Sequence, residues 1–173
     1  MSTFSDALVV HLADRDYYDF VLASIEKAYS RIFVSMFLFD IRPARDVRGQ
    51  ALDLAMALAE KKRTGVDVRV LLNGQVSTPE LGAANVATGA LLESYGVPHR
   101  RIFIVDDKRI GSHAKWVIID QMAVVGSQNW TDDAFNENTE DAVAIEGESV
   151  GLLETEFITL WKKGRGLPQY ETK

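Results

Sequence analysis

The stretch SHAKWVIIDQMAVVGSQNW, residues 112 to 130, decides the fold of this chain. Two apolar runs rich in β-branched residues, 115–119 and 122–125, flank a short polar connection and predict a β-hairpin. Successive side chains of a strand point to opposite faces of the sheet, so His113 and Lys115 are expected on the same side. The hairpin thus sets an imidazole beside an ammonium group.

Further polar side chains at this hairpin indicate a site for a phosphate group. The second strand runs into Gly126-Ser127-Gln128-Asn129, a bend of small and polar residues that supplies a hydroxyl and a carboxamide. Lysine offers a point charge to an oxyanion, and serine and asparagine offer neutral donors. Histidine can attack or carry a proton at neutral pH. The sequence therefore predicts a phosphate site that contains a nucleophile.

The pattern H-x-K-x4-D from His113 to Asp120, followed by G-S-x-N at 126–129, resembles the HKD signature of the phospholipase D superfamily. The N-x-E-D at 138–141 resembles the continuation of that signature. Members of the family hydrolyse or transfer phosphodiesters through a covalent phosphohistidine, without a metal ion. The family usually has six residues between the aspartate and the glycine, and this chain has five, so its hairpin is one residue shorter.

The resemblance implies roles for individual residues. It assigns five residues to catalysis and one to substrate binding: His113, Lys115, Asn129, Glu140 and Asp120, and then Ser127. His113 is the implied nucleophile, and Lys115 and Asn129 are the implied phosphate ligands. Glu140 is implied to orient the histidine. Asp120 is expected to serve the hairpin more than the chemistry.

The motif occurs once, although the family's mechanism uses two histidines, one to attack phosphorus and one to protonate the leaving oxygen. Two residues after His11 stands Ala13, and two after His99 stands Arg101, so the chain has no second H-x-K. The chain resembles the small members of the family, in which two copies of a single-motif chain form a dimer. A twofold interface would place two copies of His113 opposite each other. We therefore expect a homodimer with one composite site.

The composition is that of a globular protein. The 173 residues are 47% hydrophobic and 25% charged, which fits one domain over residues 1–173. The absence of cysteine excludes disulfides and thiolate zinc sites, and the three histidines form no H-x-x-H pair. We expect no metal and no cofactor. The sequence shows neither a signal-peptide pattern nor an apolar run of spanning length, so we expect cytoplasmic residence without stable membrane insertion.

Strands and helices alternate along most of the chain, which predicts an α/β fold. We expect a mixed, largely parallel β-sheet flanked by helices on both faces, similar to a single phospholipase D-like domain over nearly the whole chain. Besides the hairpin, the expected strands are 7–12, 32–39, 66–72, 97–105 and 142–145. The expected helices are 17–29, 51–62, 79–94, 130–135 and 149–163. Residues 164–173 are expected to form a loose tail.

The motif predicts the bond that is cleaved rather than the molecule. The basic residues Arg100 and Arg101, with Lys108 and Arg109 just before the motif, could guide a polyanionic backbone, and we assign Arg100 and Arg101 to substrate binding. Such charges could equally be solvated surface residues. The net charge of -6 argues against broad affinity for nucleic acid.

Three functions are open at this stage. The first is a metal-independent phosphodiesterase that acts on nucleic acid, with an endonuclease as the expected kind, because small dimeric members of the family are more often nucleases. The second is a phospholipase D or phosphatidyl transferase. The third is a catalytically weak relative that binds nucleic acid or a partner protein. Nuclease activity in EDTA, release of a lipid headgroup, or salt-sensitive binding without turnover would separate them.

Overall fold

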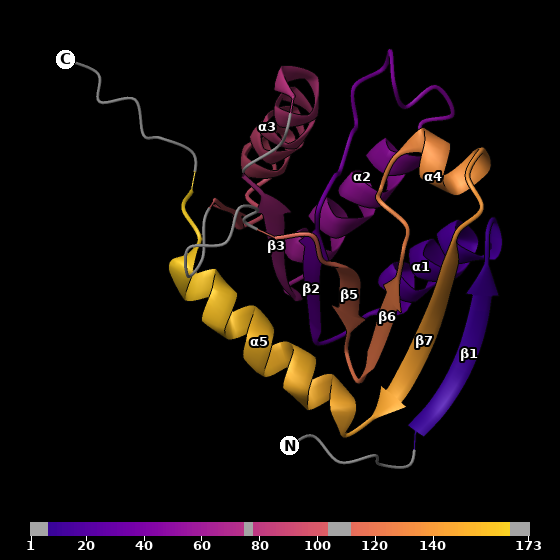
Figure 1. Ribbon diagram of the computed structural model, residues 1–173. Helices are drawn as coiled ribbons and strands as arrows, with labels where there is room; N and C mark the ends of the chain where they lie inside the picture. Colours follow the sequence, from indigo (N-terminus) through magenta and orange to yellow (C-terminus); the bar gives the residue numbers. More distant parts are fainter. Residues whose placement is uncertain (1–6, 75–77, 104–111, 167–173) are drawn as a thin grey trace.

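The computed structural model describes residues 7–74, 78–103 and 112–166, and Figure 1 shows their arrangement around one sheet. The sheet has seven strands in the order β1-β7-β6-β5-β2-β3-β4. Their bounds are β1 Ala7–Ala13, β2 Arg31–Met36, β3 Asp67–Asn73, β4 His99–Ile102, β5 Lys115–Ile119, β6 Met122–Gly126 and β7 Asp141–Gly147. β2, β3 and β4 pair in parallel, and every other neighbouring pair is antiparallel. Five strands therefore share one direction, and β5 and β7 run against them.

Helices cover both faces of this sheet, which confirms the predicted α/β fold with a mixed sheet. The helices are α1 Asp16–Lys27, α2 Gln50–Arg63, α3 Pro79–Ser94, α4 Asp132–Asn136 and α5 Ser149–Lys163. α1, α2 and α3 lie on one face, and α5 crosses the other (Figure 1). Parallel pairing is confined to β2, β3 and β4, where long helical connections return the chain. No helix of the described ranges is long and apolar enough to cross a membrane.

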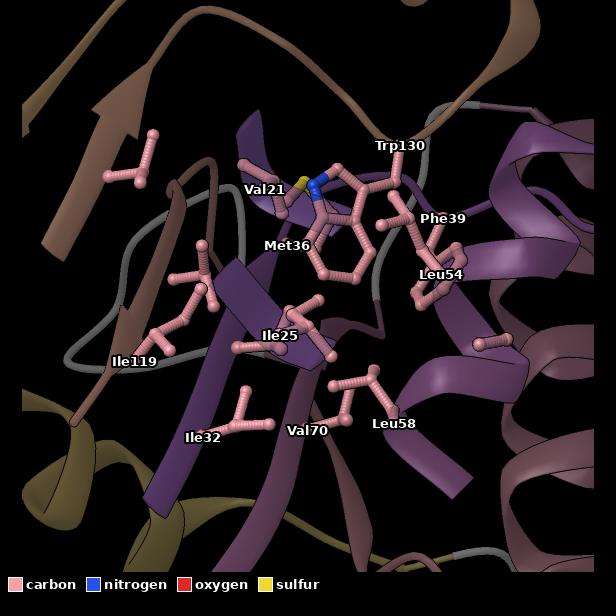
Figure 2. Close-up of a cluster of buried hydrophobic side chains, with 14 of the residues drawn as sticks. Val21, Ile25, Ile32, Met36, Phe39, Leu54, Leu58, Val70, Ile119 and Trp130 are labelled. Carbon is pink, nitrogen blue, oxygen red and sulfur yellow. The ribbon is translucent and has the colours of Figure 1, made fainter. Parts of the chain in front are cut away.

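Two apolar clusters fill the space between the sheet and its helices. Strand β5 contributes to both, because Val117 and Ile119 face the α1 and α2 side while Trp116 and Ile118 face α5. Figure 2 shows the larger cluster, in which labelled side chains of α1, α2, the sheet and the segments that follow β2 and β6 meet: Val21, Ile25, Ile32, Met36, Phe39, Leu54, Leu58, Val70, Ile119 and Trp130. Burial of both strand faces explains why the central strands are nearly uniformly apolar.

Two element boundaries matter for the site. α3 begins as the sequence predicts, because the Thr78 hydroxyl accepts a hydrogen bond from the Leu81 N–H and Pro79 occupies the first helical position. β2 ends at Met36, three residues earlier than expected. Beyond it the chain bends, and Phe39 forms an isolated bridge with the segment after β6. Met36, the last residue of β2, pairs with Lys115, so β2 ends at the edge where the motif lies.

The predicted loose tail is wrong for the residues that directly follow α5. Arg165 exchanges two backbone hydrogen bonds with Arg101, at 2.7 and 3.0 Å, and so adds a bridge outside β4. Residues 167–173 lie outside the described part of the chain. The edge of the sheet at β4 is therefore partly closed by the chain itself.

Candidate active site

One edge of the sheet, the upper edge in Figure 1, collects most of the motif. β2, β3 and β6 end at this edge, whereas β5 and β7 run the other way and begin there. His113 and Lys115 therefore lie at the start of β5, Ser127 directly after β6 and Glu140 directly before β7. Opposed strand directions explain how residues 27 positions apart reach one edge.

His113 and Lys115 lie side by side, as strand alternation predicts. Lys115 Nζ is 3.2 Å from His113 Nδ1 and 3.2 Å from the His113 carbonyl oxygen. An ammonium group can only donate, so the ring nitrogen that it faces must be unprotonated in this pairing. Partial burial, followed by the charge of Lys115, lowers the pKa of His113. A neutral imidazole, which is the nucleophilic form, is therefore favoured at neutral pH.

Two opposing effects act on the pKa of Lys115, and burial is the larger of the two. Partial burial lowers the pKa of Lys115, and the charge of Glu140 raises it. The two residues therefore interact electrostatically across the site edge. This interaction favours the charged ammonium beside the imidazole, where an anionic ligand would meet it.

Phe37 is part of this arrangement, although the sequence reasoning gave it no role. Its ring centroid lies 4.3 Å from that of His113, with a tilt of 50°, and Lys115 Nζ lies 5.2 Å from the same ring. The sequence places this aromatic residue near the end of an apolar strand. That signal does not reveal a contact with residues more than seventy positions later.

Glu140 is held by four hydrogen bonds at the start of β7. Its carboxylate accepts from the Ser127 hydroxyl and from Asn138 Nδ2, the latter at 3.2 Å. Its backbone N–H donates to Asp14 Oδ1 and its carbonyl accepts from the Asp14 N–H, both at 2.9 Å. Among the described residues, no hydrogen bond joins Glu140 to His113. The predicted orienting contact is thus not formed within one chain.

Unpaired buried polar atoms gather at the bend after β6. Within the described part of the chain, Gln128 Nε2, Gln128 Oε1 and Asn129 Oδ1 are buried without a hydrogen-bond partner. Gln128 is 1% exposed, and its amide lies against Gly126, where a Cβ atom would be 2.4 Å from Gln128 Oε1. Glycine at this position is required by that close approach. Unpaired buried amides cost free energy, and such costs are typical of functional sites.

Asp120 is separated from the other motif residues. It occupies the turn at the far end of β5, where its carboxylate accepts hydrogen bonds from the backbone N–H groups of Tyr29, Ser30 and Arg31 at 2.9 to 3.1 Å. Its φ of 53° is that of a tight turn. These contacts tie the hairpin to the start of β2. Asp120 therefore lies apart from the motif residues at the site edge, as the expectation that it serves the hairpin predicts.

The structure also divides the basic pair on β4. Arg100 Nη1 donates to the Trp161 carbonyl at 2.5 Å, and its guanidinium lies 4.9 Å from the Trp161 ring, so it is bound to α5. The Arg101 guanidinium lies 5.4 Å from the ring of Phe103. Alternation along a strand sends the two arginines to opposite faces, so they do not form one substrate strip. Lys108 and Arg109 lie outside the described residues.

The gathered groups can bind and attack a tetrahedral anion. An exposed imidazole stands beside an ammonium, and a hydroxyl and a carboxamide lie at the same edge, which matches the donors that stabilise developing charge on a phosphoryl group. In the described ranges, no three histidine, aspartate or glutamate side chains are grouped to hold a metal ion.

Comparisons with known proteins agree with this fold. The family described as "Cardiolipin synthase, PLD-like domain" matches residues 21–161. Nuc, a phospholipase D family member from Salmonella typhimurium, is similar with a TM-score of 0.75 and 24% identity, over 92% of this chain and 97% of Nuc. NucT from Helicobacter pylori is similar with a TM-score of 0.71 and 16% identity, over 93% and 99% of the two chains. The phosphatidylserine synthase of Haemophilus influenzae gives 0.70 and 12%, over 95% of this chain and 41% of the synthase. No curated protein matches the sequence.

Proposed function

This chain belongs to the phospholipase D-like domain family, and on that premise we propose that it is a metal-independent phosphodiesterase that acts on nucleic acid. The observation that carries the proposal is the imidazole of His113, exposed and 3.2 Å from the ammonium of Lys115. A neutral nucleophile next to a fixed positive charge is what attack on a phosphodiester requires.

The proposed reaction proceeds through a phosphohistidine. A nitrogen of His113 attacks phosphorus, the bond from phosphorus to the leaving oxygen breaks, and a second histidine gives that oxygen a proton. Water then attacks phosphorus and passes a proton to the second histidine. The bond between phosphorus and the His113 nitrogen breaks, so the phosphate product leaves and both rings are restored. Lys115 and Asn129 would stabilise the charge that builds up on the phosphoryl oxygens, and Ser127 is proposed to bind the same group.

The second histidine is proposed to come from a second copy of the chain. The other two histidines do not serve, because His11 of β1 pairs with Asp141 of β7 at 2.8 Å and His99 is half-buried against α3. A twofold axis near the site edge would bring two copies of His113 together. In that assembly we also propose the contact of Glu140 with an imidazole, which is not made within one chain.

Nucleic acid is proposed as the substrate because small dimeric members of the family are more often nucleases, and this chain has the length of two small similar proteins. The chain covers 97% of Nuc and 99% of NucT, but only 41% of the phosphatidylserine synthase. A phosphatidyl transferase is the second candidate, and the likeness to a phosphatidylserine synthase and the family's own description favour it.

The first experiment measures hydrolysis of bis(p-nitrophenyl) phosphate in excess EDTA by the wild type and by His113→Ala. We expect release of p-nitrophenolate by the wild type alone. We also expect a phosphorylated histidine in wild-type samples whose reaction is stopped with an alkaline denaturant, because acid would hydrolyse the phosphohistidine. His11→Ala is the matched control, because it removes an exposed histidine that is outside the candidate site. Turnover that His113→Ala retains, or a folded wild type without turnover, would reject the proposal.

The substrate class is then tested on single-stranded DNA, RNA, duplex DNA and vesicles of phosphatidylglycerol. Cleavage of a polynucleotide with no change in the vesicles is the expected result. Headgroup release from the vesicles without cleavage of any polynucleotide would replace the proposed substrate with the lipid alternative. Sedimentation at the assay concentration tests the homodimer, which an active monomer would contradict.

A further inference from the structure

Phe37 contacts both charged members of the candidate site. The centroid of the Phe37 ring is 4.3 Å from the centroid of the His113 ring and 5.2 Å from Lys115 Nζ. Because the same Nζ is 3.2 Å from His113 Nδ1, each of the three side chains contacts the other two. The imidazole and the ammonium thus share one aromatic neighbour.

The position of Phe37 is fixed from behind by α3. Asn85 is 1% exposed, and its Nδ2 donates to the carbonyl oxygens of Phe37 and Asn73, both at 2.8 Å. Its Oδ1 accepts from the Phe39 N–H at 2.9 Å. This amide bridges the ends of β2 and β3 with three hydrogen bonds in a buried place, where breaking them is costly. Phe37 therefore stands on a rigid support.

A ring held in this way affects the imidazole in two ways, by restricting its rotamers and by excluding water from one side. It occupies one side of His113 and so limits the rotamers that an exposed histidine would otherwise sample. It also excludes water from that side, which disfavours the charged form of the imidazole. The face of the ring attracts the ammonium of Lys115 and keeps it at the site. The charged groups that face the cluster from the described elements are Lys115 of β5 and Glu140 before β7.

We infer that Phe37 is a positioning residue, which holds the His113 imidazole and the Lys115 ammonium in one fixed arrangement for phosphoryl transfer. Its catalytic consequence rests on the proposed function. The arrangement of the three side chains can be tested without a substrate. A failure of the positioning role can therefore be distinguished from a failure of the proposed function.

The first test is an NMR titration of the His113 ring in the wild type, Phe37→Leu and Phe37→Tyr. We expect Phe37→Leu to raise the pKa of His113 toward its ordinary 6.5 and to abolish the ring-current shift of its carbon-bound protons. Phe37→Tyr keeps a ring and should restore both observables. Phe103→Leu is the matched control, because it removes a phenylalanine ring that contacts Arg101 rather than His113. An unchanged titration in Phe37→Leu would overturn the inference.

The second test is kinetic, with bis(p-nitrophenyl) phosphate. We expect Phe37→Leu to lower kcat about tenfold with a smaller change in KM, since misplaced reacting groups cost rate more than binding. The acid limb of its pH profile should move upward with the pKa of His113. If the wild type turns over no diester, the proposed function fails and the titration alone decides. Circular dichroism checks the fold, and Phe37→Met, whose unbranched and flexible side chain adapts to the space that the ring leaves, replaces the leucine variant if that variant does not fold.

Discussion

Gly126 and Gln128 are in such close contact that no side chain fits between them. A Cβ atom on Gly126 would lie 2.4 Å from Gln128 Oε1, 2.5 Å from the Cβ of Ala142 and 2.7 Å from the Asp141 carbonyl oxygen. The contact closes the bend that carries Ser127 to the site edge.

Gly126→Ala should therefore destabilise the protein, because two of the three clashing groups belong to the neighbouring strand and cannot move freely. We expect the free energy of unfolding in urea to fall by about 1–3 kcal/mol. Gly151→Ala is the control, since a Cβ there meets nothing within 4 Å and the residue lies in α5. That change should stabilise by about 0.5–1 kcal/mol. Equal effects of the two variants would contradict the close-contact argument.

The unpaired amide of Gln128 gives a second prediction. Gln128→Met keeps the shape of the side chain and removes two buried polar atoms without partners, so the free energy of unfolding should stay equal or rise by about 1 kcal/mol. Gln128→Glu should lower it, because a carboxylate would be buried without a counter-ion. Thermal melting of both variants measures the difference. A methionine variant less stable than the glutamate variant would show that the amide has partners in solution.

Asp120 and His113 should respond to mutation in opposite ways. Asp120→Ala removes the acceptor of three backbone N–H groups and should lower the free energy of unfolding by about 2–3 kcal/mol. The folded variant should keep the wild-type kcat. His113→Ala should leave the melting temperature nearly unchanged and abolish turnover. A folded Asp120→Ala protein with a much lower kcat would show that Asp120 serves the chemistry and not only the hairpin.

His99 predicts how stability depends on pH. Burial lowers its pKa from the ordinary 6.5, while Glu93 opposes this shift and Arg101 adds to it. The unfolded chain then binds a proton at a higher pH than the folded chain does. Stability from this group is therefore full above pH 6.5 and is lost as the pH falls from 6.5 through the lowered pKa. Urea unfolding at pH 7.5 and pH 5 should show a smaller loss for His99→Gln than for the wild type, and an equal loss would refute the assignment.

The sequence was most informative where local signals determine an element. The bounds of α5 agree with the expected 149–163, and α3 begins after its Thr78 cap. β2 was expected to continue to residue 39. It ends at Met36 because Asn85 binds the backbone of Phe37 and Phe39, a contact that local pattern does not reveal.

The positions of site residues were predictable where the alternation of side chains along a strand determines them. They were not predictable where contacts between distant parts of the chain determine them. Alternation brings His113 and Lys115 together, and the same alternation separates Arg100 from Arg101. Asp120 belongs to the motif, yet seven residues of extended chain span about 20 Å, which already separates it from His113.

The position of α5 in the chain has a consequence during synthesis. β2 and β5 emerge from the ribosome long before the helix that covers their second face, and Phe33 meets its stacking partner Phe157, 4.7 Å away between centroids, only when α5 arrives. Until then the nascent polypeptide exposes an apolar surface that a chaperone could bind. A messenger truncated before the codons of α5 should accordingly yield aggregates rather than a smaller folded product.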